Sequence, residues 1–292
     1  MKTGLIVVDK VEGRSSVTRC YSKYPLKFII PKKAGPSATD AVWIYSLTYG
    51  GGIVSGDCIS CELIVGDGCT AVLTTQASTK VYKSLGLKCS EQILEIKVGS
   101  DALLVLIPDP VTCFLGARYT QKQTFSVASN SSLLVVDWIT SGRLENGEKW
   151  EFELYKSTNN IVVQGHQPLF LDAVLLEHGS SISIAERMQG YQVVAMVIIL
   201  GPKLVHVQHK FKEDVKRLMN DKLYASSNVN GHHKRTRPDN QKLDFIASCS
   251  IFGPKGVGLV VRIAAMTTES VYKFLQRQLA SMESSLGVSP YS

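Results

Sequence analysis

Short apolar segments alternate with glycine, aspartate, serine and proline along residues 42–136. β-Branched residues are frequent in these segments, and the polar breaks have the spacing typical of strands joined by turns. In residues 61–65 and 93–98 alternation indicates one buried face and one wetter face, and the inward positions are Leu63, Val65, Ile96 and Val98. The pattern predicts a mainly β protein.

A tight turn between two strands recurs three times in this region. The turns begin at Val65, Val98 and Val127, so the successive offsets are 33 and 29 residues. Repetition at such a period favours stacked β layers, which would form an irregular, solenoid-like β-sheet scaffold. An ordinary β-sandwich is the alternative, because three imperfect copies also arise in a simple meander.

Two segments in the C-terminal half have the apolar period of an α-helix. The first covers residues 210–223, and its stripe contains Phe211, Val215, Leu218, Met219 and Leu223. The second begins at Thr267 or Thr268, either of which can cap a helix, and stops at Gly287. Its apolar face contains Val271, Phe274, Leu275, Leu279, Met282 and Leu286. We expect both helices to pack on the sheet.

The segment between these helices differs from the rest of the chain. Residues 225–242 are rich in Ser, Asn, Gly, His and Lys and contain few apolar side chains, which is typical of a flexible surface loop. Residues 245–252 and 257–264 then return to a strand-like composition. We therefore expect a single domain over residues 1–292, with a flexible loop at 225–242.

Composition limits the class of protein. Of the 292 residues, 45% are apolar and 20% are charged, as in soluble globular proteins. The longest apolar run, residues 193–200, is far shorter than the roughly 20 residues that span a bilayer. The apolar stretch near the N-terminus is too short for a secretory signal. We expect a cytoplasmic protein without a membrane span, whose seven dispersed cysteines are reduced and mostly packed.

The formal net charge of +7 favours acidic partners but identifies no ligand. Much of this charge is local, since the tract at residues 232–237 contains two histidines and three basic residues. The tract lacks interleaved aromatic residues and any nucleic-acid-binding motif. We expect no nucleic-acid partner, and a nucleic-acid-binding module is the third candidate function.

A glycine cluster at residues 50–57 contains Gly50, Gly51, Gly52 and Gly56. Adjacent backbone N–H groups can cradle a phosphate, but a nucleotide loop needs Lys and Ser or Thr after its last glycine and a helix behind it. Here Asp57 would repel phosphate, and a strand-like segment follows. The cluster is better explained as a tight turn in which backbones approach closely.

The remaining candidates for metal binding or catalysis are weak. Cys58 and Cys61 have no second pair to complete a zinc site, and residues three apart in a strand point to opposite faces. His232 and His233 lie in the basic loop, where nothing orients them. The sequence contains no G-x-S-x-G elbow. We expect no enzyme, although a β-rich hydrolase or metal enzyme is the alternative, because carboxylates paired in space are invisible in one sequence.

Several ordered segments resemble the urease accessory protein family UreD, also called UreH. Residues 73–82 resemble the family's L-T-T-x-x-x-T/A-K-x-Y segment, and residues 47–57 resemble its glycine turn. Further matches occur at residues 24–27, 108–110, 116–118, 142–148 and 258–262. The order and spacing of these segments carry the resemblance more than any one of them.

The resemblance implies a β-rich protein with two helices, in agreement with the pattern above. It also implies a function in nickel loading of urease. UreD-like proteins bind UreF, which recruits the GTPase UreG, and the assembly docks on apo-urease so that nickel reaches its site. The family likeness thus implies a scaffold and nickel-delivery chaperone that binds nickel transiently and has no tightly bound cofactor.

The same resemblance implies a polar route for nickel through the scaffold. On the matching motifs we assign it to Asp57, Asp137, Glu145 and Glu148, with Lys80 and Arg143 as further members. A carboxylate lining suits a divalent cation that must enter and leave. A structural role is the alternative, in which Asp57 caps the turn and pairs with Lys80, and Arg143 pairs with Glu148 to brace a loop.

Overall fold

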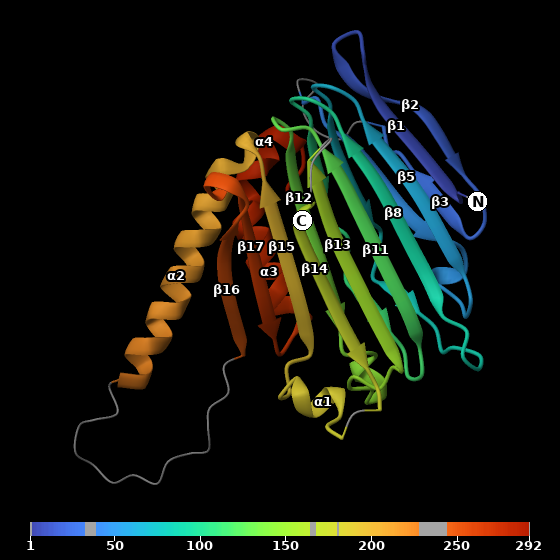
Figure 1. The fold of residues 1–292 in the computed structure, drawn as a ribbon, viewed down its shortest axis with the longest axis vertical. Helices are drawn as coiled ribbons and strands as arrows, with labels where there is room; N and C mark the ends of the chain where they lie inside the picture. The colour runs from blue at the N-terminus through green and yellow to red at the C-terminus, as the bar shows by residue number, and fades with distance from the viewer. Residues whose placement is uncertain (1, 33–38, 164–167, 180, 228–243, 292) are drawn as a thin grey trace.

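The computed structural model describes residues 2–32, 39–163, 168–179, 181–227 and 244–291. Two β-sheets and a layer of helices form the molecule (Figure 1). The first sheet has seven strands in the order β14-β13-β11-β8-β5-β1-β2. They are β1 (Gly4–Val11), β2 (Arg14–Ser22), β5 (Cys58–Val65), β8 (Ser90–Val98), β11 (Arg118–Val127), β13 (Leu154–Val163) and β14 (Pro168–Glu177).

The second sheet has ten strands, and its main path is β16-β17-β15-β12-β9-β6-β4-β3. These strands are β3 (Leu26–Ile29), β4 (Val42–Thr48), β6 (Thr70–Thr75), β9 (Leu103–Leu106), β12 (Ser132–Thr140), β15 (Val193–Leu200), β16 (Phe245–Phe252) and β17 (Gly258–Ala265). Two short strands, β7 (Thr79–Val81) and β10 (Val111–Cys113), pair beside β12. The strand-rich prediction is therefore confirmed.

From β4 to β13 the chain alternates between the two sheets, apart from the short strands β7 and β10, and the successive long strands within each sheet pair in parallel. This is the solenoid-like stacking that the repeated turns predicted. The turns at Val65, Val98 and Val127 lie in a row, since the Gly68 N–H donates to the Ser100 carbonyl and the Asp101 N–H donates to the Asn130 side chain. After β13 the strands pair in antiparallel fashion.

The opposite end of the coils carries longer connections, at residues 49–57, 76–89, 107–117 and 141–153. We call this the long-loop end; it is the lower end in Figure 1, beside helix α1 (Ile184–Arg187). The family-like segments 47–57, 73–82, 108–110 and 142–148 all lie here or lead into it. Segments that are distant in the sequence are thus gathered at one end of the molecule.

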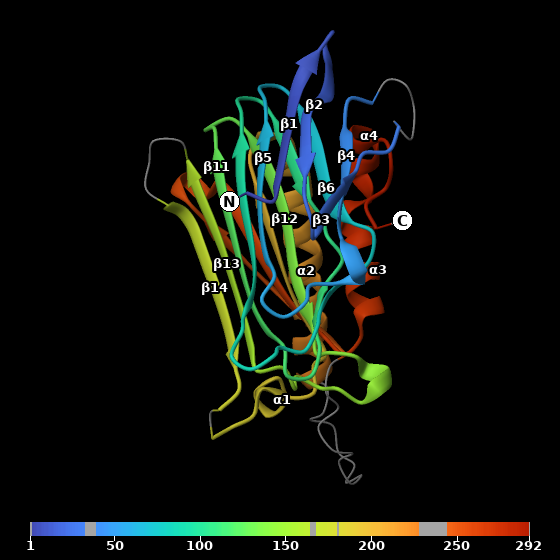
Figure 2. The same ribbon diagram turned by 90° about the vertical axis from the view of Figure 1, so that its right-hand side faces the viewer.

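Two apolar cores hold the layers together. One lies between the sheets and contains the predicted inward residues Leu63, Val65, Ile96 and Val98. The other lies between the ten-stranded sheet and helices α2 (Val205–Ser227) and α3 (Thr268–Leu279), which cover its outer face (Figure 2). The longest apolar run of the sequence, residues 193–200, forms β15, a buried inner strand of that sheet.

Helix α2 starts five residues before the predicted boundary at Lys210, because Gly201 and Pro202 end β15 and open a helical turn. Phe211 and Val215 are buried as predicted. Met219 is 47% exposed, so its assignment to the buried stripe was wrong. The predicted loop 225–242 also began too early, since residues 225–227 belong to α2. The remainder of that loop, which includes His232 and His233, lies outside the described residues. The side chain of Leu223 is likewise outside the described part of the chain.

The last helical segment matches its predicted face. Thr267 caps α3 by accepting the Ser270 N–H, and Gly287 ends α4 (Glu283–Leu286) in a left-handed conformation. All six predicted apolar residues are buried. A 3₁₀ turn at Ala280–Met282 interrupts the helix that the sequence predicted as continuous. The Trp43 Nε1–H of β4 donates to the Leu286 carbonyl over 2.9 Å, which ties an early strand to this final segment.

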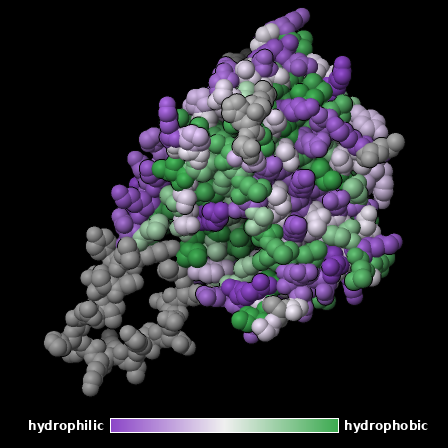
Figure 3. Space-filling view, in the orientation of Figure 1, coloured by the Kyte–Doolittle hydropathy of each residue, from purple (hydrophilic) through white to green (hydrophobic). Residues whose placement is uncertain are grey.

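The surface seen in the orientation of Figure 1 carries both apolar and polar side chains. In the orientation of Figure 1, apolar side chains gather near the middle of the surface and polar ones surround them (Figure 3). Exposed Leu171 and Leu175 of β14 are among the apolar residues of the seven-stranded sheet. Within the ranges that the structure describes, no helix is both long and apolar enough to cross a membrane.

Candidate functional site

A row of polar side chains lies inside the molecule, on the inward face of strands β11 and β13. Alternation along each strand turns every second residue towards the other sheet. Parallel pairing sets these residues side by side, because Gln121 is in register with Ser157 and Gln123 with Asn159. All four side chains are buried. An interior position for four neutral polar groups is uncommon and requires partners.

Asp137 of β12, in the opposite sheet, supplies the central partner. Its carboxylate accepts hydrogen bonds from Gln121 Nε2 at 3.1 Å, Ser157 Oγ at 2.7 Å and Asn159 Nδ2 at 2.7 Å. No ion pair to Asp137 is formed within the described ranges. Burial raises the pKa of the Asp137 carboxyl, and the three hydrogen bonds oppose this rise. The site is therefore a buried carboxylate held by neutral donors.

The polar row continues beyond Asp137 on both sides. The Gln123 Nε2–H donates to Asn159 Oδ1 at 3.1 Å. The Tyr119 hydroxyl lies between Gln121 and Gln92, at 3.2 and 2.9 Å from their side-chain oxygens. These contacts link β8, β11, β13 and β12 through side chains alone. We call Gln92, Gln121, Gln123, Asp137, Ser157 and Asn159 the polar row.

A cavity of about 60 Å³ adjoins the row. Asp137, Gln92, Gln121 and Gln123 line it, together with Asp109 from the loop after β9. This volume is enough to hold water. Asp137 keeps some accessible surface and is part of the lining of this cavity.

A wider cavity of about 220 Å³ lies at the long-loop end. It shares Ser46, Thr75, Thr79 and Gln92 with the inner cavity, so the two adjoin. Its lining includes Gly51 and the polar side chains of Gln76, Ser78 and Thr79, together with apolar residues such as Leu47. Three of the family-like segments, residues 24–27, 47–57 and 73–82, thus contribute to a mouth of mixed polarity that adjoins the cavity beside Asp137.

The structure separates the six charged residues that the sequence assigned to one route. Of the six, Asp137 alone belongs to the polar row between the two sheets. Asp57 Oδ2 accepts the Val54 N–H at 3.0 Å, so this carboxylate caps the glycine turn. Lys80 has an exposed side chain, while its carbonyl accepts the Ile53 N–H at 2.8 Å. The alternative pairing of Asp57 with Lys80 was wrong, as the described residues form no such ion pair.

Arg143 and Glu148 form a brace in the loop 141–153. The buried Glu148 carboxylate accepts from the Arg143 backbone N–H at 3.1 Å and from its Nε at 3.0 Å, and it forms an ion pair with the same guanidinium. That guanidinium also lies 4.0 Å from the centre of the Phe114 ring. The hydrogen bonds from Arg143 lower the pKa of Glu148. Glu145 is exposed on the 3₁₀ turn Leu144–Asn146.

The glycine cluster is a turn, as predicted, and no helix of the phosphate-loop kind follows it, because the chain enters β5 directly. Gly50, Gly51 and Gly56 have positive φ angles. Gly52 is extended, but a Cβ added there would lie 2.6 Å from the Lys80 carbonyl oxygen. That oxygen is fixed by its bond to the Ile53 N–H. Gly52 is therefore required for close approach of the two loops.

We expect Gly52→Ala to lower the free energy of unfolding by about 2–3 kcal/mol, because the backbone of residue 80 cannot retreat. Gly50→Ala is the matched control. A Cβ at residue 50 meets nothing within 4 Å, so only its φ of 75° opposes the change, at a cost of about 1 kcal/mol. Urea denaturation measures both values, and equal losses would contradict the role given to Gly52.

The cysteines and other ligand types form no centre in the described parts of the chain. Cys58 is exposed and Cys61 buried, on opposite faces of β5 as predicted. All seven cysteines are free, but Cys20 and Cys58 are exposed rather than packed. Among the residues described, no three histidine, cysteine, aspartate or glutamate side chains are placed to hold a metal ion.

These features define a two-sheet, solenoid-like β scaffold with a row of polar side chains inside its apolar core. The family model of the UreD urease accessory protein matches residues 3–291. The chain is 61% identical to urease accessory protein D of Arabidopsis thaliana over 294 residues, which cover 100% of both chains. It is 34% identical to urease accessory protein UreD of Anaeromyxobacter sp. over 289 residues, covering 99% of this chain and 88% of the relative. The chain belongs to the UreD family of urease accessory proteins.

Proposed function

We propose that this protein acts in urease assembly as a non-catalytic scaffold that passes nickel through its interior to apo-urease, together with UreF and the GTPase UreG. The observation that carries the proposal is the polar row with Asp137 at its centre. A buried carboxylate without a cationic partner is costly for folding. Its presence in an otherwise apolar core favours a functional explanation.

The chemistry of the row suits passage better than storage. Carboxylate, amide and hydroxyl oxygens bind divalent cations, whereas imidazole and thiolate hold nickel more firmly. The row offers one carboxylate and several neutral oxygens, so a cation would be attracted without being trapped. Asp109 and Asp137 line the same cavity, which supports a path from the long-loop end inward.

The braced long-loop end supports the role of a docking scaffold. Glu148, Arg143 and Phe114 hold the loop 141–153, and Asp57 holds the glycine turn. In this proposal these residues keep the mouth in shape and Asp137 contacts the ion. In this proposal GTP hydrolysis belongs to UreG. The glycine cluster of the present chain agrees with this, because it leads into a strand and not into the helix of a phosphate loop.

We expect Gln123→Leu to slow nickel-dependent urease activation about tenfold, because an apolar side chain would remove a polar contact worth about 1.4 kcal/mol from the passage. The assay combines purified apo-urease, UreF, UreG, nickel and the full chain, and measures the rate at which urease activity develops. Thr124→Val is the matched control, since the next residue on β11 faces away from the interior. Complex formation is measured separately by co-purification.

The same assay without the chain tests the broader proposal. If urease is activated equally well without the chain, the role in assembly is wrong. If the chain is needed but Gln123→Leu and Thr124→Val behave alike, the scaffold role stands and the interior passage does not.

A further inference from the structure

The polar row reaches the open edge of the molecule, where an ion pair ends it. On the seven-stranded sheet, Gln123 is in register with Asn159, and Asn159 with Asp172 of the edge strand β14. On the ten-stranded sheet, Asp137 is in register with Met196, and Met196 with Arg262 of β17. Two facing rows therefore run outward from Asp137 and converge on Asp172 and Arg262.

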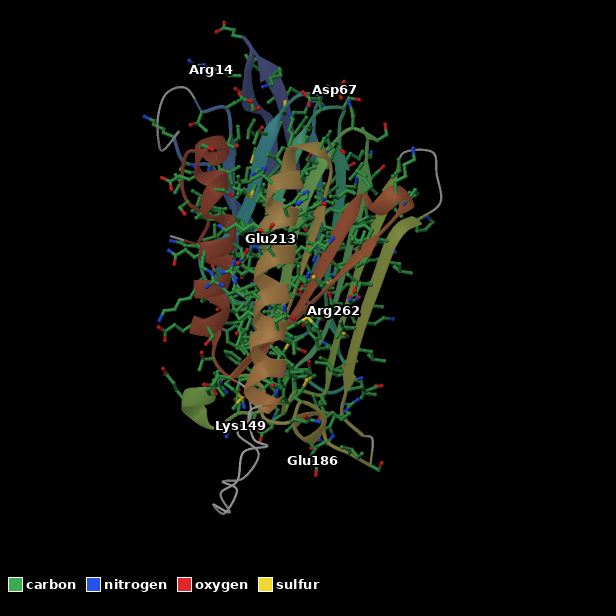
Figure 4. The ribbon with its side chains drawn as sticks, turned by 90° about the vertical axis from the view of Figure 1, so that its left-hand side faces the viewer. Arg14, Asp67, Lys149, Glu186, Glu213 and Arg262 are labelled. Carbon is green, nitrogen blue, oxygen red and sulfur yellow. The ribbon has the colours of Figure 1, made fainter. Side chains whose placement is uncertain are left out.

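Asp172 and Arg262 join the two sheets at this edge. The Arg262 guanidinium donates to Asp172 Oδ1 at 2.7 Å. The Asp172 side chain is 13% exposed, whereas that of Arg262 is 53% exposed. In Figure 4 Arg262 is seen between helix α2 and strand β14. The carboxylate thus faces inward and the guanidinium covers it from the solvent side.

We infer that Arg262 is a gate at the outer end of the nickel passage, which masks the Asp172 carboxylate until the guanidinium is displaced. This inference rests on the proposed function. A guanidinium and a divalent cation compete for the same carboxylate oxygens, so a paired Asp172 offers a cation no free ligand. The positive charge of Arg262 also repels a cation that arrives from either side.

The surroundings support a gate more than a simple clamp. Because the Arg262 side chain is half-exposed, its guanidinium can move into solvent, where its charge is hydrated. The Asp172 carboxylate would then continue the line of oxygens that starts at Asp137. Asp172 is in register with Asn159, whose amide donates to Asp137, so Asp172 stands next in line after the polar row.

The test measures the nickel concentration that gives half-maximal urease activation, with the full chain in complex with UreF, UreG and apo-urease. Arg262→Gln removes the competing cation, and we expect the required concentration to fall about two- to fivefold. Asp172→Asn removes the outer carboxylate, and we expect the concentration to rise by a similar factor. Arg262→Lys keeps the charge and should restore values close to those of the native chain.

The opposite directions of these shifts distinguish a gate from a structural clamp. If the ion pair is only a structural clamp, the nickel concentration for half-maximal activation should shift in the same direction in both variants. The unfolding temperature, which is measured in parallel, should then fall in both. Lys273→Gln on α3 is the control, because it removes an exposed ion pair with Glu269 that lies away from the row. If Asp172→Asn does not fold, Asp172→Ser replaces it.

Two results would overturn the inference while leaving the proposed function in place. Shifts in the same direction for Arg262→Gln and Asp172→Asn would do so, as would native values for both, provided that Gln123→Leu still slows activation. If Gln123→Leu is also without effect, the interior passage itself is wrong. The two failures are therefore separable.

Discussion

Replacing Asp137 with asparagine is expected to slow nickel-dependent urease activation at least about tenfold, because the proposed passage would lose its central charged group. The replacement has nearly the same shape, and its amide can still contact Ser157 and Asn159. Glu145→Gln is the control, since Glu145 is an exposed carboxylate at the long-loop end that the sequence assigned to the route. Activation rates of the three chains provide the comparison.

The same replacement has an expected signature in the pH dependence of stability. The Asp137 pKa is raised in the folded state, so the carboxyl favours folding while it is protonated and this advantage is lost as the pH rises through the folded pKa. The asparagine variant lacks this loss. We therefore expect its free energy of unfolding, relative to the native chain, to increase as the pH rises above about 4. Urea denaturation across this pH range measures the difference in the free energy of unfolding between the two chains. A difference that decreases as the pH rises would contradict a buried site that disfavours the charged carboxylate.

Replacing Gly201 with alanine is expected to have the largest effect on stability, a loss of at least about 4 kcal/mol. Gly201 has a φ of 99°, and an added Cβ would lie 2.2 Å from the Ser131 carbonyl oxygen and 2.6 Å from the Ser132 Cα. Both are backbone atoms, one at the end of the turn after β11 and the other at the first residue of β12, so no side-chain movement relieves the clash. Gly201 also joins β15 to α2, and a shift there would disturb the docking of the helix.

Gly147→Ala is the matched control for this prediction. Gly147 has a φ of 82°, but a Cβ there meets nothing within 4 Å. We expect a loss of only about 1 kcal/mol from the left-handed conformation. Urea denaturation of both variants checks the difference, and a loss at Gly201 no greater than that at Gly147 would show that the turn adapts.

The architecture could be predicted from the sequence where apolar and polar residues alternate clearly. In β5 and β8 the alternation identified the inward residues Leu63 and Ile96, and the repeated turns predicted the stacking. The choice between a solenoid and a sandwich depended on parallel pairing, which one sequence does not encode in its local pattern. The start of α2 was missed because Val207 is its only buried residue between Val205 and Lys210.

The polar row could not be predicted, for a physical reason. In β11 the inward residues Gln121 and Gln123 alternate with outward Lys122 and Thr124, so both faces look polar. The signal for a strand with a buried face is absent there. The partners of Gln121 and Gln123 come from other strands, and register between strands follows from pairing over long sequence separations.

The family-like motifs identified residues of the long-loop end but not the groups that these residues contact. Asp57 and Glu148 lie at the long-loop end, and the structure gives both carboxylates local partners. Only Asp137 joined a set of groups from different strands. The assignment of Asp57, Glu148 and Asp137 to a nickel route stays a prediction. Of these three residues, only Asp137 belongs to the polar row.

The bond between Trp43 and Leu286 has a consequence for how the chain is made. The two residues are separated by 243 positions, so this contact on the early strand β4 forms only after residue 286 has been synthesised. A nascent chain leaving the ribosome would expose this part of its surface until then. A chain truncated before Leu286 should therefore leave Trp43 without this partner and be more prone to aggregate than the full chain.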